Sequence, residues 1–197
     1  MKNLRRMPEQ NKKRTVRIAF VRIPDSADRK PSVLHETACG LTRFVIGKYW
    51  ADGPETLVFG TGENGKPYLP EHPEICFNWS HSGSYIVTAV CGVPVGIDIQ
   101  EMKSSDVGRL AGKILNPQEV QEFLQSDDPR GYFFREWVLK ESYVKWTGEG
   151  LTRSLQQLPM DGWPAMIEID KEYMCAIRAD APLDIRMEEV LWQQIRK

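Results

Sequence analysis

The chain has 197 residues, enough for one large domain or two small ones. Lys and Arg total 26 against 27 Asp and Glu, so no strong net charge draws the chain to nucleic acid or to a membrane surface. Its apolar content is that of an ordinary soluble globular protein, and no apolar run is long enough to span a bilayer.

The basic residues of the segment 1–14 are not followed by a hydrophobic stretch, so this segment is not a secretory signal. We expect a disordered tail there, the alternative being a basic arm that contacts an acidic partner. The cysteines are scattered and form no Cys-x-x-Cys pair. We therefore expect free or buried thiols in a reducing, cytoplasmic compartment rather than a zinc site, at Cys39, Cys76, Cys91 and Cys175.

The first part of the chain predicts a strand followed by a long helix. Apolar and basic residues alternate over Thr15–Pro24, which is the period of a strand. A polar loop, Asp25–Pro31, comes next. Ser32 is the expected cap of a helix that runs to Tyr49, and Asp52–Pro54 is expected to break it.

Short strands separated by turns are expected in the following segment. Gly60–Pro70 is rich in turn residues, Ser80–Ser84 is predicted as a turn, and Gly92 is expected to join a hairpin of the last two strands. The predicted strands are Thr56–Thr61, Ile75–Trp79, Tyr85–Cys91 and Pro94–Gln100.

Helices come first in the remainder of the chain, and strands follow. Asn116–Glu119 has the order of a capped helix start, with proline at the first position and glutamate at the third. A long helix is predicted from about Asp128, which can cap it, to Trp146, with Gly148 suited to its end. We then expect a hairpin of Met166–Asp170 with Tyr173–Arg178, and a strand at Ile185–Trp192.

The segment Val95–Gln100 predicts a strand whose two faces differ chemically. Its aliphatic residues point toward a core, while Asp98 and Gln100 lie side by side on the opposite face and Gly96 leaves room beside them. Two oxygen-bearing side chains on one face can hold a hard cation. The alternative from periodicity alone is an ordinary half-exposed strand.

On the long helix, Glu141 and Lys145 are four residues apart and therefore share a face. Taken alone, this spacing is also that of a surface ion pair, which contributes only about 0.3–0.5 kcal/mol. The helix and the strand together indicate more than either does alone, and in this joint pattern Glu141 follows Asp98 by 43 positions (141 minus 98).

Four motifs follow one another along the chain: Gly65–Pro70, Phe77–Gly83, Gly96–Asp98 and Trp137–Lys145. The last two, Gly-Ile-Asp and Trp-Val-Leu-Lys-Glu-Ser-Tyr-Val-Lys, resemble the paired signature of the 4'-phosphopantetheinyl transferases. The first two are similar to stretches of the larger, monomeric surfactin type of that family. The resemblance extends over roughly residues 55 to 180.

The resemblance implies an α+β fold, with two halves related by a pseudo-twofold axis and an active site at their interface. The halves would be residues 15–101 and 102–197. It also implies a reaction, the Mg²⁺-dependent transfer of the 4'-phosphopantetheine arm of coenzyme A to a serine of an apo acyl or peptidyl carrier protein, with release of 3',5'-ADP. Because one chain carries both halves, a monomer is expected.

The family's site residues carry over to matching positions. Asp98 and Glu141 would be the carboxylate ligands of Mg²⁺, and Glu141 would also help to deprotonate the carrier serine. Lys145 would reach the pyrophosphate of the coenzyme. Ser80 and His81 match a pair that contacts the 3'-phosphate, although a lone histidine can equally be structural.

Two further lysines carry open alternatives. Lys66 matches a lysine near the adenine and the 3'-phosphate, but a lysine in a turn can also be simply solvated. Lys140 is a candidate coenzyme contact, with an ion pair to Glu136 four residues earlier as the alternative.

The sequence departs from the family at Gln100, where many relatives carry a second carboxylate. An amide oxygen can ligate Mg²⁺ or hold a metal-bound water without adding charge, so weaker metal binding is expected. A second departure is His35-Glu36, in the place of upstream basic residues. The alternative function, which only Gln100 supports, is a weakly active or inactive coenzyme A and carrier-protein binding module. An unrelated Mg²⁺ phosphotransferase is disfavoured, because no G-x-x-x-x-G-K-[ST] loop occurs.

Overall fold

The structure, a computed structural model, describes residues 15–50, 56–103, 107–150 and 154–195. The predicted tail 1–14 and the predicted helix break at Asp52–Pro54 lie outside these residues. Within the described part of the chain, every helix is too short or too polar to cross a membrane. All four cysteines are free thiols, as expected.

The strands form two main sheets and a small ribbon. The larger sheet has the order β4-β5-β1-β9, the smaller sheet has the order β6-β8-β7, and β2 pairs with β3. All pairings are antiparallel except that of β1 with β9. The strands are β1 (Thr15–Arg22), β2 (Gly60–Thr61), β3 (Pro67–Tyr68), β4 (Cys76–Ser82), β5 (Tyr85–Cys91), β6 (Val95–Glu101), β7 (Trp163–Met166), β8 (Tyr173–Ala179) and β9 (Asp184–Glu189).

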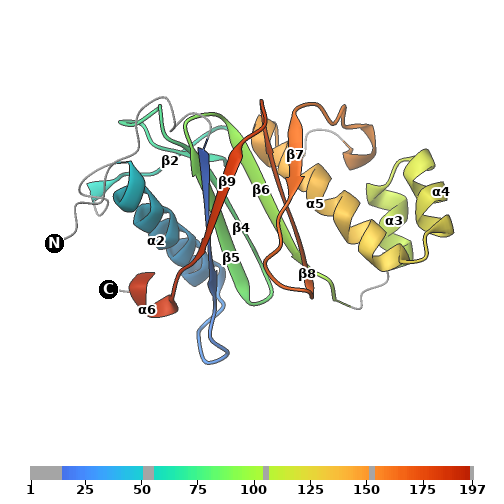
Figure 1. The fold of residues 1–197 in the computed structure, drawn as a ribbon, viewed down its shortest axis with the longest axis horizontal. Helices are drawn as coiled ribbons and strands as arrows, with labels where there is room; N and C mark the ends of the chain where they lie inside the picture. The colour runs from blue at the N-terminus through green and yellow to red at the C-terminus, as the bar shows by residue number, and fades with distance from the viewer. Residues whose placement is uncertain (1–14, 51–55, 104–106, 151–153, 196–197) are drawn as a thin grey trace.

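The two longest helices lie on opposite sides of the strands, α2 on one side and α5 on the other (Figure 1). The described helices are α2 (Pro31–Tyr49), α3 (Val107–Ile114), α4 (Pro117–Gln125), α5 (Pro129–Thr147) and α6 (Trp192–Ile195), with a 3-10 turn, η2 (Leu155–Gln157). The α+β class expected from the sequence is confirmed.

Three hydrophobic clusters hold these layers together. One joins α2 to the larger sheet, the second contains side chains of both sheets, and the third packs α3 and α4 against the first half of α5. β5 contributes to the first two clusters, and all seven of its residues are buried because both of its faces are covered. β5 is therefore packed on both sides, next to β4, which carries Ser80 and His81.

Local signals predicted α4 and α5 correctly, whereas α3 and α6 were not predicted. Asn116 and Glu119 form the reciprocal capping box at the start of α4. Asp128 caps α5 by accepting a hydrogen bond from the Gly131 N–H at 2.9 Å, and Gly148 ends the helix with φ of 72°. A hairpin of β7 with β8 is present, but β7 shares only Met166 with the strand predicted at Met166–Asp170. The strand predicted at Ile185–Trp192 ends at Glu189, and Trp192 begins α6.

Three expectations about local structure were wrong. The α2 helix begins at Pro31 and not after Ser32, because proline already suits the first helical position. β4 continues through Ser82, so the predicted turn at Ser80–Ser84 is confined to the two residues after it. Of the strand predicted at Thr56–Thr61, only the last two residues are strand.

The predicted hairpin around Gly92 is also wrong. β5 and β6 both exist, but β5 pairs with β4 and β1 whereas β6 pairs with β8 of the other sheet. The chain therefore changes sheets at Gly92, because β6 is completed by a strand that comes more than 70 residues later. β9 makes the opposite change of sheet: it follows β8 in sequence, but it pairs with β1 in the larger sheet.

Candidate active site

The site is built where β6 lies directly against α5. A Cβ atom added to Gly96 would come within 2.2 Å of both the Ser142 carbonyl oxygen and the Trp146 amide nitrogen. Only glycine leaves the space for this approach of strand and helix. The sequence predicted that Gly96 leaves room, and the structure shows that the α5 backbone fills it.

Asp98 lies at the centre of a compact polar cluster, although it is only 2% exposed. Its Oδ1 atom accepts a hydrogen bond from Ser80 Oγ at 2.8 Å and is paired with Lys145 Nζ at 2.6 Å. Lys145 Nζ also donates to Ser80 Oγ at 2.8 Å, so the three groups form a triangle. Gln100 Nε2 donates to the second carboxylate oxygen at 3.0 Å. The buried carboxylate is thereby fully hydrogen-bonded.

These groups open onto a cleft of about 370 Å³. It is lined by Trp79, Ser80, His81, Asp98, Gln100, Trp137, Glu141 and Lys145. The two carboxylates therefore reach the same cleft from different elements, Asp98 from β6 and Glu141 from α5. The predicted pairing of this strand with this helix is present, and both carboxylates line one cleft.

Burial raises the pKa of Glu141, and the negative charge of Asp98 raises it further. Lys145 and a hydrogen bond from Trp137 oppose these effects without reversing them. The charged form of Glu141 is therefore less favourable here than in water, and a positive ion bound beside it would favour that form.

His81 stands at the rim of the same cleft, beside Ser80 on β4. Although its side chain is exposed on one side, partial desolvation lowers its pKa, and the nearby charge of Lys145 lowers it further. A neutral imidazole next to an ammonium group suits the arrival of an anion, which would favour protonation of the ring.

Lys66 lies outside this cleft, although it lines an adjoining one together with Trp79 and Lys145. Its ammonium group donates to the main-chain oxygens of Val95 at 3.2 Å and Trp146 at 2.8 Å. Burial lowers its pKa. Lys66 therefore holds the start of β6 against the end of α5, a contact that the sequence did not predict.

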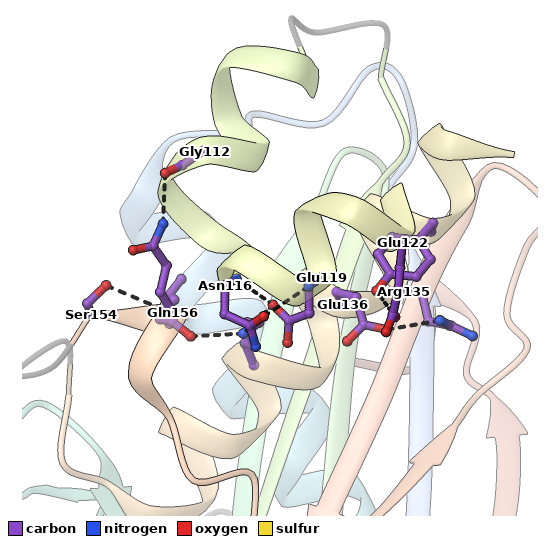
Figure 2. Close-up of polar contacts among 11 residues, drawn as sticks. Gly112, Asn116, Glu119, Glu122, Arg135, Glu136, Ser154 and Gln156 are labelled. Carbon is purple, nitrogen blue, oxygen red and sulfur yellow. Dashed lines mark hydrogen bonds and ion pairs between the residues drawn. The ribbon is translucent and has the colours of Figure 1, made fainter. Parts of the chain in front are cut away.

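Lys140 does not reach the cleft. Its side chain is 1% exposed and its Nζ atom pairs with Glu119 Oε2 at 2.9 Å and donates to the Leu155 carbonyl at 3.0 Å. The predicted alternative partner, Glu136, is paired with Arg135 instead. Figure 2 shows polar contacts around Glu119, whose carboxylate also accepts the Asn116 N–H and so completes the cap of α4. Lys140 points away from the cleft that Glu141 lines, because adjacent residues of α5 point about 100° apart.

Two tryptophans of the cleft were not predicted as site residues. Trp79 lies between Asn78 and Ser80 in the second motif, and Trp137 precedes Glu141 by four residues. The spacing of Trp137 and Glu141 on one helix face was the available signal. For Trp79 there was none, because its place at the cleft depends on how β4 meets α5.

Oxygen atoms of Asp98, Gln100 and Glu141 are suited to a hard divalent cation such as Mg²⁺. Among the described residues, no group of three or more His, Cys, Asp or Glu side chains could hold a metal. Two carboxylates and an amide leave coordination positions for a ligand's own oxygens and for water, which is how Mg²⁺ is commonly bound beside phosphates.

Comparison with known proteins finds relatives of this sequence. The profile of the family described as "4'-phosphopantetheinyl transferase superfamily" matches residues 94–180, which include both carboxylates. A 4'-phosphopantetheinyl transferase of Bacillus subtilis is 38% identical over 141 residues, covering 69% of this chain and 60% of the relative. The transferase Sfp of Bacillus subtilis strain 168 is 33% identical over 177 residues, covering 78% of this chain and 79% of Sfp.

One solved structure, holo-[acyl-carrier-protein] synthase of Thermotoga maritima, is a distant match with 21% identity and a TM-score of 0.38, covering 43% of this chain and 61% of that one. The chain spans 60% of the length of the Bacillus subtilis relative named first and 79% of Sfp. With 33% identity over 79% of the length of Sfp, the chain belongs to the 4'-phosphopantetheinyl transferase superfamily.

Proposed function

We propose that this protein transfers the 4'-phosphopantetheine arm of coenzyme A to a serine of an apo carrier protein and releases 3',5'-ADP. The observation that supports this most is the shared cleft of Asp98 and Glu141, two carboxylates that reach it from a strand and a helix. Family membership supplies the reaction, and the cleft supplies groups that suit it.

We further propose that Asp98, Glu141 and the amide oxygen of Gln100 hold a Mg²⁺ ion, directly or through water. The ion would neutralise the negative charge of the pyrophosphate as the leaving group departs. Burial and the neighbouring charge of Asp98 disfavour the charged form of Glu141, and this supports the assignment because a cation would favour that form. Gln100 contributes no charge, and we expect a weaker metal site than one with three carboxylates.

The chain's own residues would divide the remaining work. Glu141 accepts the proton of the carrier serine, directly or through water. Lys145 faces the cleft with one ammonium group that Asp98 and Ser80 hold in place, and it contacts the pyrophosphate. Ser80 and His81 lie beside it and contact the 3'-phosphate.

The two lysines outside the cleft receive different roles. Lys66 lines the adjoining hollow, so a coenzyme contact for it remains part of this proposal, alongside the main-chain contacts of its ammonium group. No coenzyme contact is proposed for Lys140, because its side chain is buried against Glu119.

The carrier protein would present its serine at the open side of the cleft. A monomer would be sufficient for the reaction, because one chain carries both halves of the fold. The halves 15–101 and 102–197 and the pseudo-twofold axis between them remain predictions. A cytoplasmic setting suits the four free thiols.

Mixing the protein with coenzyme A, Mg²⁺ and an apo carrier domain tests the proposal. The carrier serine should gain the mass of one phosphopantetheine arm, and the Glu141→Gln variant should lose transfer by about two orders of magnitude or more while it stays folded. Near-normal transfer by this variant would refute the role of Glu141. Coenzyme binding without any mass gain would support the alternative, a binding module, which the neutral Gln100 favours.

A further inference from the structure

A row of polar side chains joins β4 to β6, although the two strands belong to different sheets. Asn78, Ser80 and Ser82 occupy alternate positions of β4 and therefore share one face of the strand. Of these three residues, only Ser80 has a place in the proposed reaction. The other two belong to the same motif, and their role is open.

Asn78 and Ser82 bind the main chain of β6. Asn78 Oδ1 accepts the Ile97 N–H at 3.0 Å, and Ser82 Oγ accepts the Glu101 N–H at 2.9 Å. Between these two contacts, Ser80 Oγ donates to the carboxylate of Asp98 at 2.8 Å. The three bonds run in the same order along both strands, as the hydrogen bonds of a main-chain ladder would.

These contacts satisfy groups that would otherwise be costly to bury. Ile97 is completely buried, and a buried main-chain N–H without a partner is unfavourable. Asn78 is itself only 5% exposed, and its main-chain oxygen accepts a hydrogen bond from the Thr88 hydroxyl at 3.3 Å. Thr88 in turn bonds to Thr42 of α2 at 2.8 Å. The main chain of β4 at Asn78 is thus tied to β5 and, through Thr88, to α2.

We propose that Asn78 and Ser82 are positioning residues, whose side chains replace a main-chain ladder between β4 and β6 and so fix Asp98 opposite Ser80 and Lys145. Asn78 has the larger part, because the N–H that it binds belongs to the residue directly before Asp98. Ser82 fixes the strand three residues beyond Asp98. The consequence for the metal rests on the function proposed above, whereas the anchoring of β6 does not.

Asn78→Ala is the main test, and Asn116→Ala is its matched control. In both positions the asparagine Oδ1 accepts one main-chain N–H, from Ile97 at 3.0 Å and from Glu119 at 2.9 Å. Asn116 caps α4 and is no part of the cleft. The two variants therefore lose the same kind of bond at different places.

The first measurement is amide hydrogen exchange, which needs neither metal nor substrate. Asn78→Ala should speed exchange at residues 96–101, and Ser82→Ala should do so at the end of this range, while Asn116→Ala speeds exchange in α4 alone. Exchange in β6 that rises no more in Asn78→Ala than in Asn116→Ala would overturn the proposal, including for a protein that proves inactive.

The second measurement is the Mg²⁺ dependence of transfer by the folded variants. Asn78→Ala should raise the half-saturating Mg²⁺ concentration about tenfold, the scale seen when a partner that orients a metal ligand is removed. Asn116→Ala should leave it unchanged. A lower melting temperature for Asn78→Ala with unchanged Mg²⁺ dependence would make the residue merely structural. If wild-type protein transfers nothing, the proposed function fails, and the exchange experiment still decides the role of Asn78.

Discussion

The Nζ atom of Lys145 lies 2.6 Å from Oδ1 of Asp98, so an ion pair inside the cleft joins α5 to β6. The Asp98 side chain is 3% exposed and the Lys145 side chain 26%. A carboxylate buried to this degree is tolerated because a cation and hydrogen-bond donors surround it. The same two side chains would meet the substrate, so the pair links stability to function.

Lys145→Met should destabilise the protein, because Asp98 keeps its charge and loses its cation. Removal of one partner from a fully buried pair costs about 3–5 kcal/mol, and the partial exposure of Lys145 reduces this to about 2–3 kcal/mol. Urea unfolding at neutral pH measures the loss. Added Mg²⁺ should restore part of it if the ion binds beside Asp98. Unchanged stability without Mg²⁺ would show that the pair contributes little.

Gly96→Ala should separate strand from helix. The new Cβ atom would lie 2.2 Å from two main-chain atoms of α5, which cannot move as a flexible side chain can. We expect a loss of several kcal/mol in the free energy of unfolding, typical of overpacking at a rigid contact, and loss of transfer.

Gly112→Ala is the matched control for this substitution. Gly112 lies in α3, and an added Cβ atom would meet no atom within 4 Å. Alanine is the better helix former, so a gain of about 0.5–1 kcal/mol is expected. Equal losses at Gly96 and Gly112 would contradict the close-contact explanation.

Lys140 and Glu119 should behave as one unit. Lys140→Met and Glu119→Gln should each destabilise the protein, and the double variant should lose less than the sum, because their side chains lie 2.9 Å apart. Coenzyme A affinity, measured by calorimetry on folded variants, should stay within about twofold of wild type. A selective loss of affinity in Lys140→Met but not in Glu119→Gln would instead support a coenzyme contact for this lysine.

His81 should titrate below the ordinary histidine pKa of about 6.5. Desolvation and the charge of Lys145 depress the pKa in the folded protein, so the unfolded chain binds more protons as the pH falls below 6.5. Its contribution to stability is therefore present above pH 6.5 and is lost as the pH falls through the folded pKa. NMR titration of the imidazole checks this, with Lys145→Met expected to raise the pKa. A wild-type pKa above 6.5 would show that desolvation and Lys145 do not lower the pKa of His81.

The best sequence predictions were those with a local physical cause. The capping box of Asn116 and Glu119, the cap at Asp128 and the glycine end of α5 all depend on residues within a few positions of one another. The alternation along β6 also placed Asp98 and its aliphatic neighbours on the correct faces, because period two is a property of the strand itself.

The errors arose where distant segments decide. The same alternation suits β5 and β6 as a hairpin or in separate sheets, and β8, far along the chain, determines the outcome. In a similar way, the sequence shows that Lys140 and Glu141 point in different directions, but it does not show that Lys140 pairs with Glu119. Lys66 was assigned by its motif alone, and its contacts with Val95 and Trp146 depend on the packing of β6 on α5.

The parallel strand β9 has a consequence for synthesis on the ribosome. It is translated after every other described strand, yet it completes the sheet that begins with β1. Until residues 184–189 leave the exit tunnel, β1 exposes one edge of unpaired amides and carbonyls to other nascent chains. Chaperone demand should therefore be greatest late in translation, and a ribosome stalled before residue 184 should carry an aggregation-prone intermediate.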